Sequence, residues 1–154
     1  MPNAVGRASA RTALAAFLTT ALVPVTVRAV YAYPRKHLAE LYPALTIESA
    51  STLRERKFIG VTKLATEFVL TIRTYVRWDD PEENPPITEQ TAEDALDYLE
   101  QMIADAFADS ANVHAGGFDL IGYDGPTETG GILREDSVLC RSEVIRVRLK
   151  MVMG

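Results

Sequence analysis

The segment LATEFVLTIRTYVRW, residues 64–78, decides the fold class because it keeps the two-residue period of a strand over its whole length. One set of alternating side chains is apolar, namely Phe68, Leu70, Ile72, Val76 and Trp78. The other set is mostly polar, namely Glu67, Thr71, Arg73, Tyr75 and Arg77. The pattern predicts a long strand with one face in the core and one face open to solvent or to a partner.

A second segment, SEVIRVRLKMVM at residues 142–153, has the same pattern. Its apolar side chains are Ile145, Val147, Leu149, Met151 and Met153. Because the alternate positions of both segments are rich in arginine and lysine, they predict a sheet whose open face is basic. The bases assigned to that face are Arg73, Arg77, Arg146, Arg148 and Lys150.

Two helices are predicted from apolar side chains at helical spacing. The first covers residues 4–22 and ends before Pro24. The second begins at Thr91, where Thr91-x-x-Asp94 resembles a capping box. Its buried stripe is Leu96, Leu99, Met102, Ile103, Ala106 and Phe107, and its acids Asp94, Asp97, Glu100 and Asp105 lie toward the outside.

The remaining segments complete an α+β domain. Residues 25–33, 44–50 and 118–123 predict shorter strands, since the first two especially are rich in β-branched and aromatic side chains. Three prolines in residues 79–90 predict an exposed loop, and residues 124–131 predict turns. We therefore expect one domain over residues 1–154, with a mostly antiparallel, mixed sheet of about five strands covered by two main helices.

Charge is distributed in blocks along the chain, although the net charge is only −5. Residues 1–39 carry five bases and no acid, whereas residues 78–133 carry fourteen acids and no base. Such blocks are solvated faces, or they face different neighbours, because complementary charge orients subunits and repels wrong partners. In the second case a positive surface of one subunit would meet a negative surface of the next, in a head-to-tail contact that can close into a ring.

No motif for catalysis or metal binding is present in the sequence. His37 and His114 are far apart, and neither has a cysteine or second histidine at ligand spacing. Cys140, the only cysteine, is expected to be a small core residue. We expect no enzyme, no catalytic residue, no metal and no cofactor. A small ligand-binding domain or enzyme, with a pocket between sheet and helices, is the alternative from another class.

The amino-terminal segment has the outline of a secretory signal, with Arg7 and Arg11 before an apolar run from Ala13 to Val25. Arg28 interrupts the approach to a cleavage site, so an internal helix is expected and an exported protein is the alternative. The apolar run is too short and too rich in threonine to span a bilayer.

The order of these elements resembles the tail terminator family, the minor tail proteins of long-tailed bacteriophages, prophages and gene transfer agents. The resemblance spans nearly the whole chain, and it lies in order and spacing more than in a sharp motif. The stretches that carry it are RTALAAFL, VTVRAVYAYP, YPALTIES, FVLTIRTYV, AEDALDYLEQMIADAF and GGILREDSVLCRSEVIRVRLKM. The loop DDPEENPPITEQ departs from the family pattern by its excess of acid and proline.

The resemblance implies a structural virion protein of the tail neck, assembled in the bacterial cytoplasm. Its subunits would form a hexameric ring that caps the head-proximal end of the tail tube, stops tube polymerisation and joins tail to head. The implied partners are other copies of the chain, the tail tube protein and a head-completion or neck protein; DNA passes through without specific binding, and no membrane is involved. Another neck protein, such as a head-completion protein, is the closest alternative.

Two sets of residues follow as candidates for this role. The subunit interface is expected to pair Arg73, Arg77, Arg146 and Arg148 of one copy with Asp94, Asp97 and Glu100 of the next. The lumen is expected to carry Asp79, Asp80, Glu82 and Glu83, because like charge keeps a moving DNA duplex from adhering.

Overall fold

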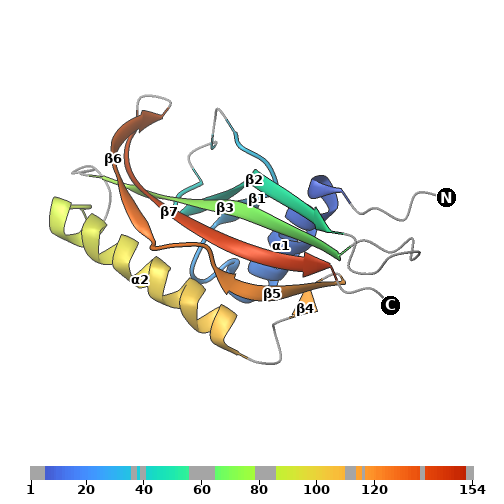
Figure 1. The fold of residues 1–154 in the computed structure, drawn as a ribbon. Coiled ribbons are helices and arrows are strands. Elements are labelled where there is room, and N and C mark those ends of the chain that lie inside the picture. Colours follow the sequence, from blue (N-terminus) through green and yellow to red (C-terminus); the bar gives the residue numbers. More distant parts are fainter. Residues whose placement is uncertain are drawn as a thin grey trace, which may run out of the picture.

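A computed structural model describes residues 6–35, 38, 41–55, 65–78, 86–109, 114–115, 117–135 and 138–151. Within these ranges the chain forms two helices and seven strands (Figure 1). In chain order they are α1 (Arg7–Leu22), β1 (Ala29–Tyr31), β2 (Ala44–Glu55), β3 (Ala65–Arg77), α2 (Glu89–Ala108), β4 (His114–Ala115), β5 (Phe118–Tyr123), β6 (Glu128–Glu135) and β7 (Val138–Met151).

The strands join in one mixed sheet with the order β1-β2-β3-β7-β5-β4, and β6 also pairs with β7. β1 and β2 are parallel, and the other pairings are antiparallel. The predicted α+β class is confirmed, and the two segments with the clearest alternation, β3 and β7, lie side by side at the centre. The sheet has two strands beyond the expected five. One is β4, which is only two residues long, and the other is β6, which begins within a segment where turns were predicted.

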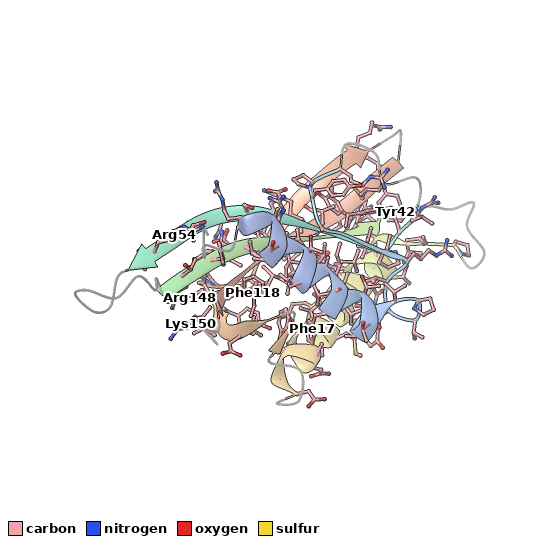
Figure 2. The ribbon with its side chains drawn as sticks, turned by 90° about the vertical axis from the view of Figure 1, so that its right-hand side faces the viewer. Phe17, Tyr42, Arg54, Phe118, Arg148 and Lys150 are labelled. Atoms are coloured by element: carbon pink, nitrogen blue, oxygen red, sulfur yellow. The ribbon has the colours of Figure 1, made fainter. Side chains whose placement is uncertain are left out.

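Both helices contribute to one apolar core on the same face of the sheet. Phe17 of α1 stacks on Phe107 of α2, with ring centres 5.7 Å apart, so the helices contact each other as well as the sheet. Phe68 of β3 meets Phe118 of β5 edge-on at 5.9 Å. Figure 2 looks onto α1 as it crosses the sheet, with Phe17 and Phe118 labelled. We call this side the helix-covered face.

The opposite side, which we call the open face, has a smaller apolar cluster at one end. Leu38, Tyr42, Ala44 and Cys140 are buried there, and the partly buried Tyr31 and Tyr75 pack against them. Cys140 is buried, which confirms its predicted place in the interior. The rest of this face carries the polar side chains of β2, β3 and β7.

The start of α2 differs from the prediction. The helix begins at Glu89, and the residue that caps it is Thr88. The Thr88 hydroxyl accepts a hydrogen bond from the Thr91 amide at 3.1 Å, and the Thr91 hydroxyl accepts one from the Thr88 amide at 2.8 Å. The predicted capping box from Thr91 to Asp94 was therefore wrong by one turn, since the box runs from Thr88 to Thr91. Thr91 makes the reciprocal hydrogen bond that a glutamate or glutamine usually makes at this position.

Other boundaries also moved. The strand predicted at residues 25–33 is reduced to the three residues of β1. β2 continues five residues beyond its predicted end, to Glu55, and β7 begins four residues before its predicted start, at Val138. Long strands are extended by their neighbours, because each added rung of hydrogen bonds pairs backbone groups that would otherwise need water. Trp78 follows β3 and is only partly buried.

Candidate subunit interface

The open face is less basic than the sequence predicts, because two of its arginines have acidic partners on neighbouring strands. Nε of Arg73 donates to Oε1 of Glu48 on β2 at 2.8 Å. Arg148 forms an ion pair with Glu67 on β3. The register places Arg73 beside Thr46 and Arg148 beside Val69, so each pair is diagonal across two strands. These cations are already neutralised within the subunit.

Arg146 lies between these two pairs and differs from both. It is opposite Thr71 in the register of β3 and β7 and is half-buried on the open face. In the part of the chain that the structure describes, Arg146 makes no ion pair. A guanidinium ion with five donors and no acidic partner is suited to bind a carboxylate from outside the subunit.

The remaining bases of this face lie toward its two ends. Lys150 is exposed near the end of β7, close to Arg148, and Figure 2 shows these two side chains well away from Tyr42. The guanidinium of Arg77 lies 5.8 Å from the centre of the Tyr42 ring, in a cation–π contact beside the apolar cluster. Of the predicted interface bases, the structure therefore singles out Arg146 as the centrally placed free cation.

The predicted acids are on α2, on the other side of the sheet. Asp94 and Asp97 are exposed and Glu100 is half-buried. Among the described residues none of the three forms an ion pair. Arg146 and these acids cannot reach each other within one subunit, because the sheet separates them.

The sequence prediction missed Glu143, a carboxylate on the helix-covered face. It is opposite Thr74 of β3, and this pair follows the apolar pair of Ile72 and Ile145 on the same face of the sheet. Its exposed fraction is 7%, and Oε2 has no hydrogen-bond partner within the described structure. The signal was present in the sequence, since Glu143 falls on the apolar phase of β7 with Ile145, Val147 and Leu149.

Burial raises the pKa of Glu143 from its usual 4.5 to about 7, and the negative charges of Glu100, Asp97 and Glu93 add to the effect. Arg141 opposes this shift but does not cancel it. Taking a carboxylate out of water favours its neutral form, and nearby like charges do the same. In the free subunit Glu143 thus stays largely protonated below about pH 7, where an ordinary glutamate is ionised.

Arg141 does not neutralise Glu143, because its guanidinium is committed elsewhere. Its Nε donates to Oε2 of Glu93 at 3.1 Å, and Nη2 donates to Oε1 of the same residue at 3.4 Å. Nη1 donates to the backbone oxygen of Gly130 on β6. Asp97, Glu100 and Glu143, which we call the acid group below, form no ion pair among the described residues.

A cavity of about 320 Å³ lies at the start of α2. Its lining includes Arg28, Tyr42, Pro43, Arg77, Ile87 and Ala92. The two arginines make it more suited to an anion than to a cation, and its volume is at the lower end of the range for small-molecule sites, roughly 300–1,000 Å³.

Several of the residues singled out in the sequence lie outside the described ranges. The expected lumen acids Asp79, Asp80, Glu82 and Glu83 lie outside the described residues, as does His37. No group of three or more histidine, cysteine, aspartate or glutamate side chains in the described ranges could hold a metal ion. Neither described helix is long and apolar enough to cross a membrane.

Comparison with known proteins adds no family to these observations. No protein-family model matches the chain, and no curated protein matches it at a significant level.

Proposed function

We propose that this protein is a ring subunit of a phage tail neck, with the role of a tail terminator. The observation that carries the proposal is the separation of free charge: Arg146 on the open face and Asp97 with Glu100 beyond the helix-covered face. These charges are unpaired within the described chain and lie on opposite sides of one sheet.

This arrangement supports a head-to-tail contact over a symmetric one. A two-fold interface brings the same patch of both copies together, so the open face would meet the open face and Arg146 would not reach the acids of α2. A head-to-tail contact instead sets the open face of one copy against α2 of the next and leaves the complementary faces free for further copies. Such a contact generates a closed ring when the rotation between copies divides a full turn.

The role in the tail rests on the order of elements that resembles the terminator family. A ring of this kind would end the tail tube and admit DNA on its way through the neck. The acidic segment after β3 supports this role, because seven successive positions, residues 79–85, contain four acids and no base. Negative charge around a channel reduces adhesion of the DNA phosphates.

Charge reversal gives a test that distinguishes this contact from a general effect on folding. Arg146→Glu alone, and the double variant Asp97→Lys with Glu100→Lys alone, should each remain monomeric by light scattering and keep the wild-type circular dichroism. Mixed in equal amounts, the two variants should assemble, because each then offers the charge that the other lacks. Arg7→Glu, an exposed reversal on α1, is the matched control and should assemble as wild type does.

The outcomes separate the possibilities. Rings of unchanged size from Arg146→Glu would remove Arg146 from the contact. A protein that stays monomeric on its own and also with purified tail tubes would end the ring proposal altogether. Binding to the portal side of a head, without binding to tubes, would favour the neighbouring role of a head-completion protein.

The lumen assignment has its own test. Replacing Asp79, Asp80, Glu82 and Glu83 by the matching amides should leave ring formation intact and lower infectivity or slow DNA passage. Rings with normal infectivity would show that the segment does not face the DNA.

A second candidate function comes from the cavity at the start of α2, which favours a small anionic ligand. Arg28 and Arg77 would supply the positive charge, and Tyr42 with Ile87 the apolar walls. Thermal-shift measurements with phosphate, short dicarboxylates and nucleotides would detect such binding. A shift that Arg77→Gln abolishes would support the ligand-binding role, and no shift with any of them would remove it.

A further inference from the structure

Burial of Glu143 is costly, because Arg141 offsets it only in part and Oε2 has no hydrogen-bond partner among the described residues. A buried polar oxygen without a hydrogen bond costs about 1–3 kcal/mol. Thr74, opposite Glu143 on β3, is 0% exposed and also has an unpartnered hydroxyl oxygen. The two residues interrupt an otherwise apolar interior close to the point where α2 presents its acids.

We propose that the acid group of Asp97, Glu100 and Glu143 is the receptor for Arg146 of the neighbouring copy, and that ring assembly is therefore linked to pH. This inference rests on the proposed ring and adds the residue that regulates it. The occupant is a second copy of the chain, because Arg146 has the complementary charge, is free of partners in the described residues, and lies on the face that a head-to-tail neighbour would present.

The surroundings of Glu143 define the direction of the linkage. From α2 it faces Glu93, Asp97 and Glu100; from its own strand it has Arg141, and from β3 the uncharged Thr74. β6 contributes Thr129, which is opposite Glu143 in the register and carries no charge. The acids outnumber the single base, so the pKa of Glu143 stays raised in the free subunit.

An arginine seated against Asp97 and Glu100 changes that balance. Opposite charge within a few ångströms lowers the pKa of a carboxyl group. The pKa of Glu143, which is raised in the free subunit, should therefore fall when the neighbouring arginine binds. Formation of each contact should then release the proton from Glu143. By linkage, association should strengthen as pH rises through the range below about 7 and become independent of pH above it. The limit is about tenfold in the association constant per pH unit for each contact, which corresponds to one proton.

The experiment measures association of the purified full chain by sedimentation between about pH 5.5 and about pH 8.5, for wild type and for Glu143→Gln. Wild type should show the rise, and Glu143→Gln should show a flatter profile over the same range, because the amide cannot release a proton. Every other titratable group is present in both proteins, so the difference between the two profiles isolates Glu143.

A second variant tests the occupant. Arg146→Gln should also flatten the profile, and the double variant with Glu143→Gln should be no flatter than either single variant. Asp105→Asn, which alters an exposed acid of α2 that accepts a hydrogen bond from Gln101, is the control and should keep the wild-type slope.

The result that overturns this inference is a ring that forms with the same pH slope in wild type and in Glu143→Gln. That outcome would leave the proposed ring function standing. Failure of the ring itself is recognised separately, as the absence of assembly at every pH and in the presence of tail tubes, and it would remove both proposals.

Discussion

Two successive rungs on the helix-covered face of β3 and β7 contrast sharply. Ile72 and Ile145 face each other under the helices, 0% and 1% exposed, in the continuous apolar core. At the next rung on the same face, Thr74 and Glu143 are also buried, but two of their oxygen atoms have no partner within the described structure. Equal burial thus has opposite consequences: the first rung stabilises the subunit, whereas the second lowers its stability and makes it sensitive to protons and neighbours.

The contrast shows where the domain departs from consistent core patterning. Local conflicts such as a buried acid among acids are expected where function, not folding, selects the residue. The apolar rungs around Phe68 to Ile72 should therefore dominate the free energy of unfolding, and the polar rung should dominate its pH dependence.

The largest effect should come from the apolar part. Phe68→Ala removes a side chain that is 0% exposed and packs edge-on against Phe118. The expected loss is about 3–5 kcal/mol in the free energy of unfolding, from lost burial and the cavity left behind. Urea unfolding followed by circular dichroism measures it. A loss below about 1 kcal/mol would show that this part of the core is not well packed.

The polar rung should show its effect through pH. The pKa of Glu143 is raised in the folded subunit, to about 7 from the usual 4.5, so only the folded state holds this proton between those values. Stability is therefore greatest at the acidic end of the window and falls as pH rises toward 7, after which the loss is complete. In Glu143→Gln this fall should be absent. The check is urea unfolding at about pH 5 and about pH 8, with the two proteins compared at each, so that ordinary carboxylates cancel in the difference.

Thr74, which is opposite Glu143, should have a smaller effect on the free energy of unfolding, and its replacement should not destabilise the subunit. Thr74→Val keeps the shape of the side chain and removes a buried hydroxyl that has no hydrogen bond. We expect the variant to be as stable as wild type or more stable by up to about 1 kcal/mol. A clear loss would mean that the hydroxyl has a partner that matters. Thr46→Val on the open face, where the buried hydroxyl is likewise unpartnered, is the matched control.

The smallest effect should come from the ion pairs of the open face. Arg73 and Glu48 are 39% and 29% exposed as side chains, so solvent screens their attraction. A double-mutant cycle with Arg73→Gln and Glu48→Gln should give a coupling of about 0.2–1 kcal/mol, decreasing with added salt. A coupling of several kcal/mol would place these residues, and not the polar rung, at the centre of the subunit's electrostatics.

Much of the fold could be predicted from local patterns. The strict alternation in β3 and β7 placed both strands, because a period of two can bury only one face of a sheet. The apolar stripes likewise placed α1 and α2. The cap of α2 was missed because two threonines, Thr88 and Thr91, can play either part in a reciprocal bond. β6 was missed because its glycines resemble a turn, and only pairing with the long β7 makes that segment a strand.

The candidate site was less predictable than the fold. The sequence correctly assigned polar residues to the open face, but it could not tell which cations were free, since Arg73 and Arg148 find their partners on strands distant in the chain. It also could not show that Glu143 would meet Glu93, Asp97 and Glu100, which are more than forty residues earlier.

The sequence by itself determined the fold class, the long paired strands and the two amphipathic helices, because these depend on periodicities that each segment carries alone. Tertiary structure alone decided which charges are neutralised, which stay free and which carboxyl group keeps its proton. The physical reason is that Coulomb interaction and desolvation depend on distance and burial in space, and both are set only when segments far apart in the chain pack together.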